Sequence, residues 1–341
     1  MTEKFPLFRL PHVALYEVLD YIGLDTIIPL SLCSKRVKSI MKDYHGPSRP
    51  RKINLNPVNY TLSVNLRIVL AVKAVTKLSE NLKEVTIGPH KVPIDIDKEG
   101  VWRTYWMDKK EGMEALVKYM SEIFNREIYS IRTAGIVTSD ELRFWIKFLE
   151  KFQGKIYMLT VLLDDDDWHH ELIRYILESD FVTGELLLSA IDLSGFEGPP
   201  PRRYSIEVLR LKPSYWVTLD HLLAMDIKRI ALNSSSLTCQ DINVFLKKWI
   251  NGECSERIKQ LFVDMENEVN FDKLTEGIEV TRRNPNLRRD YIMGNGVRQI
   301  SGGLDIKRTH DGRMATIVNM PTEREKLNVF FWPDLEGNPY H

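Results

Sequence analysis

The stretch FPLFRLPHVALYEVLDYIGLDTIIPLSLCSKRVKSIMK, residues 5–42, holds three short helical patterns in fewer than forty residues. Pro11 suits the start of the first helix, because its missing N–H would have no intrahelical partner. Gly23 suits the position just past the end of that helix, and apolar residues recur at helical spacing between the two. A second, shorter helix follows, and Ser34 is placed to cap a third. This stretch predicts a small helical module at the N-terminus.

The three helices carry more apolar surface than they can bury among themselves. A module of about forty residues is close to the lower size limit for independent folding, so the excess must pack against a partner or against the rest of the chain. An ordinary helical hairpin that belongs to the core of the main body is the alternative. We expect one set of residues to be buried partly in the module's own core and partly against a partner protein: Leu10, Pro11, Val18, Leu19, Ile22, Leu30, Leu32, Val37 and Ile40.

The module resembles an F-box, the motif that binds the Skp-type adaptor of cullin–RING ubiquitin ligases. His12 stands where the motif commonly has an acidic residue, and Val37 stands where an aromatic residue is common. The resemblance implies that the chain binds a Skp-type adaptor and, through it, a cullin. The matching positions are Leu10, Pro11, Val18, Leu19, Ile22 and the run LSLCSKR at residues 30–36.

The composition limits the possible partners and compartments. The 341 residues include 47 basic and 47 acidic side chains, so no global field attracts nucleic acid or a lipid surface. The chain has no run of about twenty apolar residues and no signal-peptide pattern at its N-terminus. Cys33, Cys239 and Cys254 lack CxxC spacing, which is typical of a reduced intracellular compartment. We therefore expect a cytoplasmic or nuclear protein.

The chain is expected to divide into four segments. The F-box covers residues 1–44, and a proline-rich linker with some extended character covers residues 45–59. An α/β domain covers residues 60–333, and a polar tail covers residues 334–341. We interpret the basic residues Arg49, Arg51 and Lys52 as part of a solvated linker, with a nucleic-acid patch as the alternative.

A short run with apolar residues at its first, fourth and sixth positions recurs through the main body. Helical patterns lie between several of these runs, with a capping box at residues 138–141 and a cap at Ser236 or Thr238. Strand, helix and strand at such spacings predict an α/β fold, an irregular solenoid similar to leucine-rich repeats, with a loop at residues 195–201. The runs begin at Leu82, Ile128, Ile156, Leu188, Ile206, Ile227 and Ile258.

The C-terminal part adds a hairpin and a second resemblance. Asp311-Gly312 lies between two strand-like runs, which predicts a hairpin, because a type I′ turn needs positive φ at both central residues. Residues 328–332 are predicted to add a last strand. Residues 237–249 and 303–317 resemble the F-box-associated domain of the second type, which belongs to the expanded nematode F-box family. The resemblance implies a substrate-recognition subunit of a ubiquitin ligase and leaves its target open.

The acidic run DDDDWHHE at residues 164–171 is the one stretch that suggests a metal. A calcium loop would need glycine at the sixth position, where His169 stands. The zinc motif that begins at His170 lacks its final histidine, because Arg174 occupies that position. We interpret the run as an acidic loop before a helix, and we expect no metal and no cofactor.

Two further groups are candidates for recognition. Trp102, Tyr105 and Trp106 lie in a charged segment that we expect to be irregular, which favours an exposed substrate-binding patch; burial in the core is the equal alternative. A basic cluster is interpreted as a solvated helix end, with an acidic partner or nucleic acid as the alternative. It consists of Arg282, Arg283, Arg288 and Arg289.

Together these patterns predict a non-enzymatic substrate-recognition adaptor of an SCF-type ubiquitin ligase complex. Its N-terminal helices would bind the Skp-type adaptor, and its α/β body would bind a protein target. One alternative is a protein-interaction scaffold that binds the adaptor without ubiquitin transfer. The other is an enzyme with a site on a solenoid, although the sequence carries neither a hydrolase elbow nor a phosphate loop. We predict no catalytic residue, no nucleic-acid partner and no membrane partner.

Overall fold

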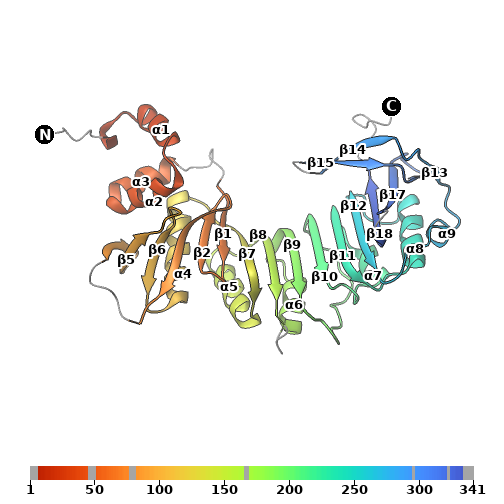
Figure 1. Cartoon of the computed structure of the whole chain (residues 1–341), viewed down its shortest axis with the longest axis horizontal. Helices are drawn as coiled ribbons and strands as arrows, with labels where there is room; N and C mark the ends of the chain where they lie inside the picture. The colour runs from red at the N-terminus through yellow and green to blue at the C-terminus, as the bar shows by residue number, and fades with distance from the viewer. Residues whose placement is uncertain are drawn as a thin grey trace. The chain divides into compact units, whose positions relative to one another are not determined.

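The computed structural model describes residues 7–44, 51–76, 82–164, 169–293, 296–320 and 323–332. It divides into two compact units. Unit 1 contains Met1–Val137 and Phe144–Ile156, and unit 2 contains Thr138–Arg143 and Tyr157–His341. Both units mix helices with strands, and unit 1 has a helical N-terminus (Figure 1). Among the described residues, no helix combines the length and the hydropathy that a membrane span requires.

The helical N-terminus predicted from the sequence is confirmed. Pro11 directly precedes the first α-helix, and Gly23 directly precedes the second. The Ser34 hydroxyl accepts a hydrogen bond from the backbone N–H of Val37 at 3.2 Å, which caps the third helix. The elements of this segment are η1 (Leu7–Arg9), α1 (His12–Asp20), α2 (Leu24–Cys33) and α3 (Lys35–Tyr44).

The sheet of unit 1 mixes parallel and antiparallel pairs. In hydrogen-bonded order its strands are β7, β1, β2, β3, β6, β5 and β4. β1 pairs parallel with β7, and β3 pairs parallel with β6, whereas the other neighbours in this order are antiparallel. The bounds are β1 (Ile53–Asn56), β2 (Thr61–Val64), β3 (Arg67–Ala74), β4 (Lys83–Ile87), β5 (His90–Ile96), β6 (Trp102–Trp106) and β7 (Ile128–Val137).

β1 lies inside the range predicted as a linker, residues 45–59, and residues 45–50 of that range lie outside the described residues. Ile53 and Leu55 are fully buried in the sheet of unit 1. Two helices follow the expected patterns: α4 (Lys109–Phe124) packs on this sheet, and α5 (Ser139–Phe152) spans the boundary between the units. The Thr138 hydroxyl accepts a hydrogen bond from the backbone N–H of Glu141 at 3.3 Å, which confirms the predicted cap of α5.

Unit 2 begins with strands in chain order and helices between them. β9 pairs parallel with β10, β10 with β11, and β11 with β12. Parallel β–α–β connections are right-handed, so α7 and α8 lie on the same face of the sheet. Thr238 caps α8 in a capping box with Asp241. The bounds are β8 (Ile156–Leu163), α6 (His169–Glu178), β9 (Val182–Ala190), β10 (Val208–Lys212), α7 (Leu219–Ala224), β11 (Arg229–Ser235), α8 (Cys239–Ile250) and β12 (Gln260–Met265).

Two of the seven predicted runs do not have the expected role. The run at Leu82 lies mainly in β4, which pairs antiparallel with β5. The run at Leu188 begins near the end of β9, so Ile191 and Leu193 follow the strand. Both errors have one cause: a short apolar run shows burial and does not show strand direction or strand ends. The predicted loop at residues 195–201 is confirmed, since these residues form neither helix nor strand.

Antiparallel strands end the parallel run in unit 2. β18 pairs antiparallel with β12 and with β17, which confirms the last strand predicted at residues 328–332. β16 and β17 form the predicted hairpin, but their last pair is Lys307 with Met314, so the connection is longer than a two-residue turn. The predicted tail, residues 334–341, lies outside the described residues. The bounds are α9 (Phe271–Leu274), β13 (Thr281–Arg282), β14 (Arg288–Met293), β15 (Gly296–Ser301), β16 (Leu304–Lys307), β17 (Met314–Met320) and β18 (Glu323–Phe331).

Candidate protein-interaction surfaces

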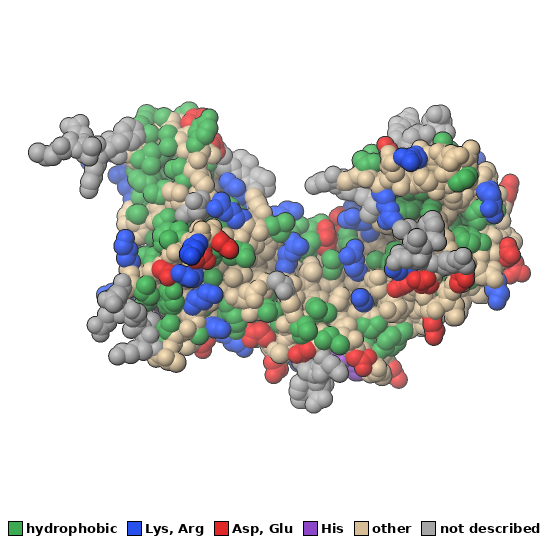
Figure 2. Space-filling view, viewed as in Figure 1, with side chains coloured by type: hydrophobic (Ala, Val, Ile, Leu, Met, Phe, Trp, Pro, Cys, Tyr) green, Lys and Arg blue, Asp and Glu red, His purple; other side chains and the backbone are tan. Residues whose placement is uncertain are grey.

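The first candidate surface is the outward side of α1. Leu15 and Leu19 of this helix are buried, yet Val13 is 77% exposed, Val18 is 38% exposed, and Tyr21 just past the helix end is 90% exposed. At about 3.6 residues per turn, Val13 and Tyr21 lie on the side opposite Leu15 and Leu19, and Val18 lies between that side and Leu15. Figure 2 shows hydrophobic side chains gathered over the N-terminal helices. An apolar surface on both sides of a helix is typical of one that packs on its own core and also on a partner.

The N-terminal helices are anchored on α4. Ser31 Oγ and Tyr119 Oη lie 2.7 Å apart, and burial raises the pKa of the Tyr119 hydroxyl. Lys38 Nζ donates to Glu122 Oε2 at 2.6 Å. These contacts join α2 and α3 to the body of unit 1 and leave the outward side of α1 exposed. The helices therefore belong to unit 1, as the alternative interpretation supposed, and still expose apolar side chains.

The predicted adaptor-binding residues fall into three groups. Leu19 and Val37 are buried and belong to the core of the helices. Pro11 and Val18 are exposed. The remaining residues are half-buried: Leu10, Ile22, Leu30, Leu32 and Ile40.

Sequence reasoning missed Val13 and Tyr21 on the outward side of α1. Both are apolar residues of the same helical pattern, and both are exposed opposite the face that contains Leu15 and Leu19. Apolar spacing alone does not separate the residues in the module's own core from those that stay exposed.

The aromatic patch predicted at residues 102–106 is a strand. These residues form β6, and the side chains of Trp102 and Tyr105 are half-buried. Trp106 is only 6% exposed, and its Nε1 donates to Thr104 Oγ1 at 2.9 Å. A Cβ atom at Gly112 would lie 2.5 Å from the Trp106 ring, so this ring packs closely on α4. The expected exposure is therefore wrong for Trp106, because sheet formation turns this residue toward the core.

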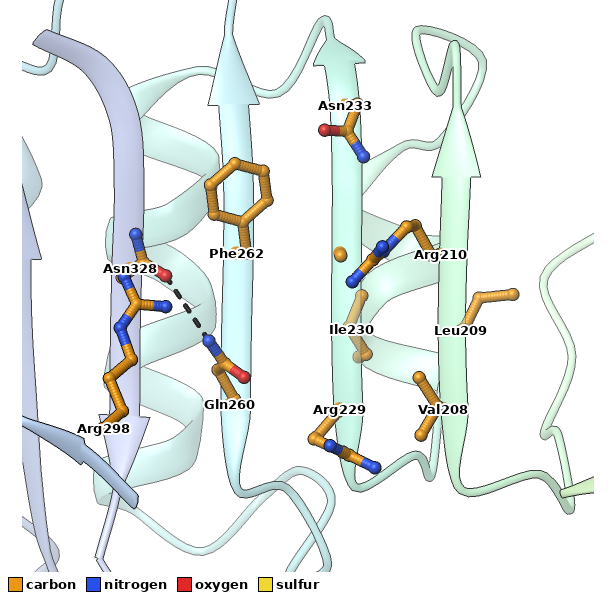
Figure 3. A pocket seen from close by; sticks show the side chains of 11 residues that line it. Val208, Leu209, Arg210, Arg229, Ile230, Asn233, Gln260, Phe262, Arg298 and Asn328 are labelled. Carbon is orange, nitrogen blue, oxygen red and sulfur yellow. Dashed lines mark hydrogen bonds between the residues drawn. The ribbon is translucent and has the colours of Figure 1, made fainter. Parts of the chain in front are cut away.

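A second candidate surface lies on the sheet of unit 2, on the face away from α7 and α8. A cavity on this face of the sheet has a volume of about 320 Å³. Figure 3 looks onto this face, with the helices behind the strands. The described residues that line the cavity include three arginines and no carboxylate. They are Val208, Leu209, Arg210, Arg229, Ile230, Ala231, Asn233, Gln260, Phe262, Arg298 and Asn328. We call this cavity the arginine cavity.

Strand register places the arginines around a small side chain. Arg210 of β10 stands opposite Ala231 of β11, and Arg229 stands opposite Val208. Figure 3 shows Arg210 reaching from β10 toward β11. At the other side of the cavity, Gln260 Nε2 donates to Asn328 Oδ1 at 3.5 Å.

The β14–β15 hairpin brings Arg298 to the arginine cavity and is anchored by a buried ion pair. Arg289 of β14 is 3% exposed, and its Nη1 lies 3.1 Å from Asp305 Oδ1. Arg283 Nε donates to Asp305 Oδ2 at 2.5 Å, and Thr316 Oγ1 donates to Oδ1 at 2.7 Å. Burial lowers the pKa of the Arg289 guanidinium.

This arrangement corrects the interpretation of the basic cluster as a solvated helix end. Arg282 lies in β13, Arg288 and Arg289 lie in β14, and Arg283 follows β13, so the cluster lies on and beside strands. Arg289 is buried because it pairs with Asp305.

The acidic run contributes no metal site among the residues that the structure describes. Within them, no group of three or more His, Cys, Asp or Glu side chains is placed to hold an ion. His169 is the first residue of α6 and is buried. Residues 165–168 lie outside the described residues. Cys33, Cys239 and Cys254 are free thiols, and burial raises the pKa of the Cys254 thiol to about 11.

The outward side of α1 and the arginine cavity are two candidate binding surfaces. Comparison with known families assigns the chain to a class. The F-box domain matches residues 7–46, and the F-box-associated family matches residues 204–263. The chain is an F-box protein with a C-terminal F-box-associated domain. These two domains imply an adaptor of SCF-type ubiquitin ligase complexes, in which F-box domains generally bind the Skp-type subunit.

Similar proteins come from Caenorhabditis elegans. The uncharacterized protein F59B2.8 is 22% identical over 94% of this chain and 76% of its own length. The Skn-1 dependent zygotic transcript 15 protein is 22% identical over 92% of this chain and 93% of its own length. The uncharacterized protein F59B2.9 is 34% identical over 38% of this chain and 31% of its own length. No solved structure matches this chain.

Proposed function

We propose that this chain is a non-enzymatic substrate-recognition subunit of an SCF-type cullin–RING ubiquitin ligase, acting in the cytoplasm or the nucleus. The observation that supports this most directly is the outward apolar side of α1, formed by Val13, Val18 and Tyr21. This surface lies within the residues that match the F-box domain. Covering a solvated apolar helix face with a partner protein lowers the free energy, because apolar surface is removed from water.

Each of the two surfaces has its own partner in this proposal. The outward side of α1 binds the Skp-type adaptor, and the sheet face of unit 2 binds the protein target. Such a subunit accelerates ubiquitin transfer by raising the local concentration of target lysines near the charged conjugating enzyme. The strands from β8 to β12, with the segments that connect them, form degenerate repeats of a leucine-rich-repeat-like solenoid. The parallel pairing of β9 to β12 supports this assignment.

The test measures the affinity of the full chain for a purified Skp-type adaptor. Val13→Asp with Tyr21→Asp should weaken binding at least ~100-fold, since burying one large apolar side chain contributes about 1.5–3 kcal/mol. Ile292→Asp is the matched control, because Ile292 is 72% exposed on β14, outside the F-box. We expect the control to bind like the unchanged chain. Equal affinity of the double variant and the control contradicts the proposal.

Co-purification of a cullin distinguishes the ubiquitin-ligase subunit from the alternative, a scaffold that binds the adaptor without ubiquitin transfer. We expect the chain to recover a cullin together with the Skp-type adaptor. Recovery of the adaptor without a cullin indicates the scaffold alternative. In that case the chain holds the adaptor and does not deliver a target to the ligase.

A further inference from the structure

Two arginines of the arginine cavity, Arg210 and Arg229, carry a charge that no described carboxylate neutralises. Among the described residues, neither Arg210 nor Arg229 forms an ion pair or hydrogen bond through its guanidinium. The neighbouring carboxylate of Glu207 is taken by Lys228, whose Nζ lies 2.5 Å from Glu207 Oε1. Each guanidinium thus keeps its full set of donors for a ligand. The lining points to an anionic ligand.

We propose that the arginine cavity binds a phosphorylated serine or threonine of the protein target. This inference rests on the proposed adaptor function and names the chemistry of its substrate. Arg210 and Arg229 come from adjacent strands and flank Ala231, whose small side chain leaves room between them. A phosphate monoester carries nearly two negative charges and three acceptor oxygens. It therefore satisfies two guanidinium forks at once, whereas a carboxylate has one charge and two oxygens.

The remaining lining suits a polypeptide neighbour of the phosphate. Phe262 and Val208 are half-buried apolar side chains beside the arginines, so they provide a surface for the residue next to the phosphorylated one. Gln260 and Asn328 offer amide groups on the far side of the cavity. A nucleic acid is less suited, because its repeating phosphates require an extended basic surface, and this chain has no net charge.

The experiment uses the full chain and immobilised peptide libraries that are degenerate around one fixed residue. The fixed residue is phosphoserine or phosphothreonine in one library, glutamate in the second and unmodified serine in the third. We expect binding to the phosphorylated library at least tenfold above the other two. Arg210→Gln and Arg229→Gln should each reduce that binding at least tenfold, since charge-assisted hydrogen bonds of this kind are among the strong ones. Arg210→Lys should restore it only in part, because lysine keeps the charge and loses the fork.

Lys212→Gln is the matched control. Lys212 is exposed at the end of the same strand, outside the cavity lining, and its loss changes the net charge equally. Equal losses for Lys212→Gln and Arg210→Gln overturn the proposal, because they show general charge attraction. Equal binding of the glutamate library overturns the commitment to phosphate. Displacement of the peptides by a single-stranded oligonucleotide, without selection among the libraries, assigns the surface to nucleic acid instead.

Affinity for the Skp-type adaptor distinguishes this inference from the proposed function. The arginine variants should bind the adaptor like the unchanged chain, which also shows that they fold. Phosphopeptide binding without adaptor binding contradicts the proposed function alone. Adaptor binding without phosphopeptide selection contradicts this inference alone.

Discussion

Asp305→Asn tests how the β14–β15 hairpin is held beside the arginine cavity. The carboxylate accepts from Arg289, Arg283 and Thr316, and Arg289 is almost completely buried. Breaking a buried pair by removing one partner costs about 3–5 kcal/mol, because the other charge stays buried and unpaired. The asparagine oxygen keeps about one of these hydrogen bonds, which contributes about 1 kcal/mol. We therefore expect a net loss of about 2–4 kcal/mol of local stability.

Amide hydrogen exchange measures this loss where it occurs. Peptides from β14, β16 and β17 should exchange at least ~30-fold faster in Asp305→Asn, since each 1.4 kcal/mol corresponds to a factor of ten. Asp290→Asn is the control, because Asp290 is an exposed carboxylate on β14. Adding Arg289→Met to Asp305→Asn should recover part of the loss by removing the unpaired charge. A change below about 1 kcal/mol in Asp305→Asn refutes the anchoring role of the ion pair.

Two further predictions concern stability elsewhere in the chain. Leu19→Ala should destabilise the N-terminal helices by about 3 kcal/mol, because Leu19 is fully buried. Val13→Ala should change their stability by less than about 0.5 kcal/mol, because Val13 is exposed. Hydrogen exchange of α1 and α3 measures both effects, and equal effects contradict the assignment of Leu19 to the buried face and Val13 to the exposed face. The hydrogen bond from Arg308 lowers the pKa of Asp311 from 3.8 to about 2, so the carboxylate stabilises the fold above pH 3.8 and this contribution is lost as the pH falls toward 2. Asp311→Asn should thus lower the urea midpoint at about pH 7 and have little effect at about pH 2, and an equal effect at both pH values contradicts the role of the charge.

Local signals predicted the helices well. The N-terminal helices, the caps at Thr138 and Thr238, and the strand β11 all follow from patterns within a few residues. Such patterns act through neighbouring backbone groups, so no knowledge of the rest of the chain is needed. The F-box resemblance covers the segment that the F-box family matches, residues 7–46. The F-box-associated family matches residues 204–263, which include the predicted segment 237–249 and do not include the predicted segment 303–317.

Features that depend on distant partners were predicted poorly. Arg289 belongs to a buried pair because Asp305, sixteen residues later, contacts it from β16, a strand of a different sheet. Trp106 is buried because α4 packs on the strand that contains it. The arginine cavity forms only when β10, β11 and β12 are placed side by side, although alternation of Arg210 and Lys212 with leucines hinted at a polar sheet face. The spacing of apolar residues predicts secondary structure and does not predict which elements contact one another.

The most direct test of the account is a hydrogen-exchange footprint of the full chain with and without a purified Skp-type adaptor. We predict slower exchange in α1 and in the residues up to Tyr21, with exchange in unit 2 unchanged. Protection confined to unit 2, or no protection at saturating adaptor, contradicts it, because the outward side of α1 would then have no role in binding.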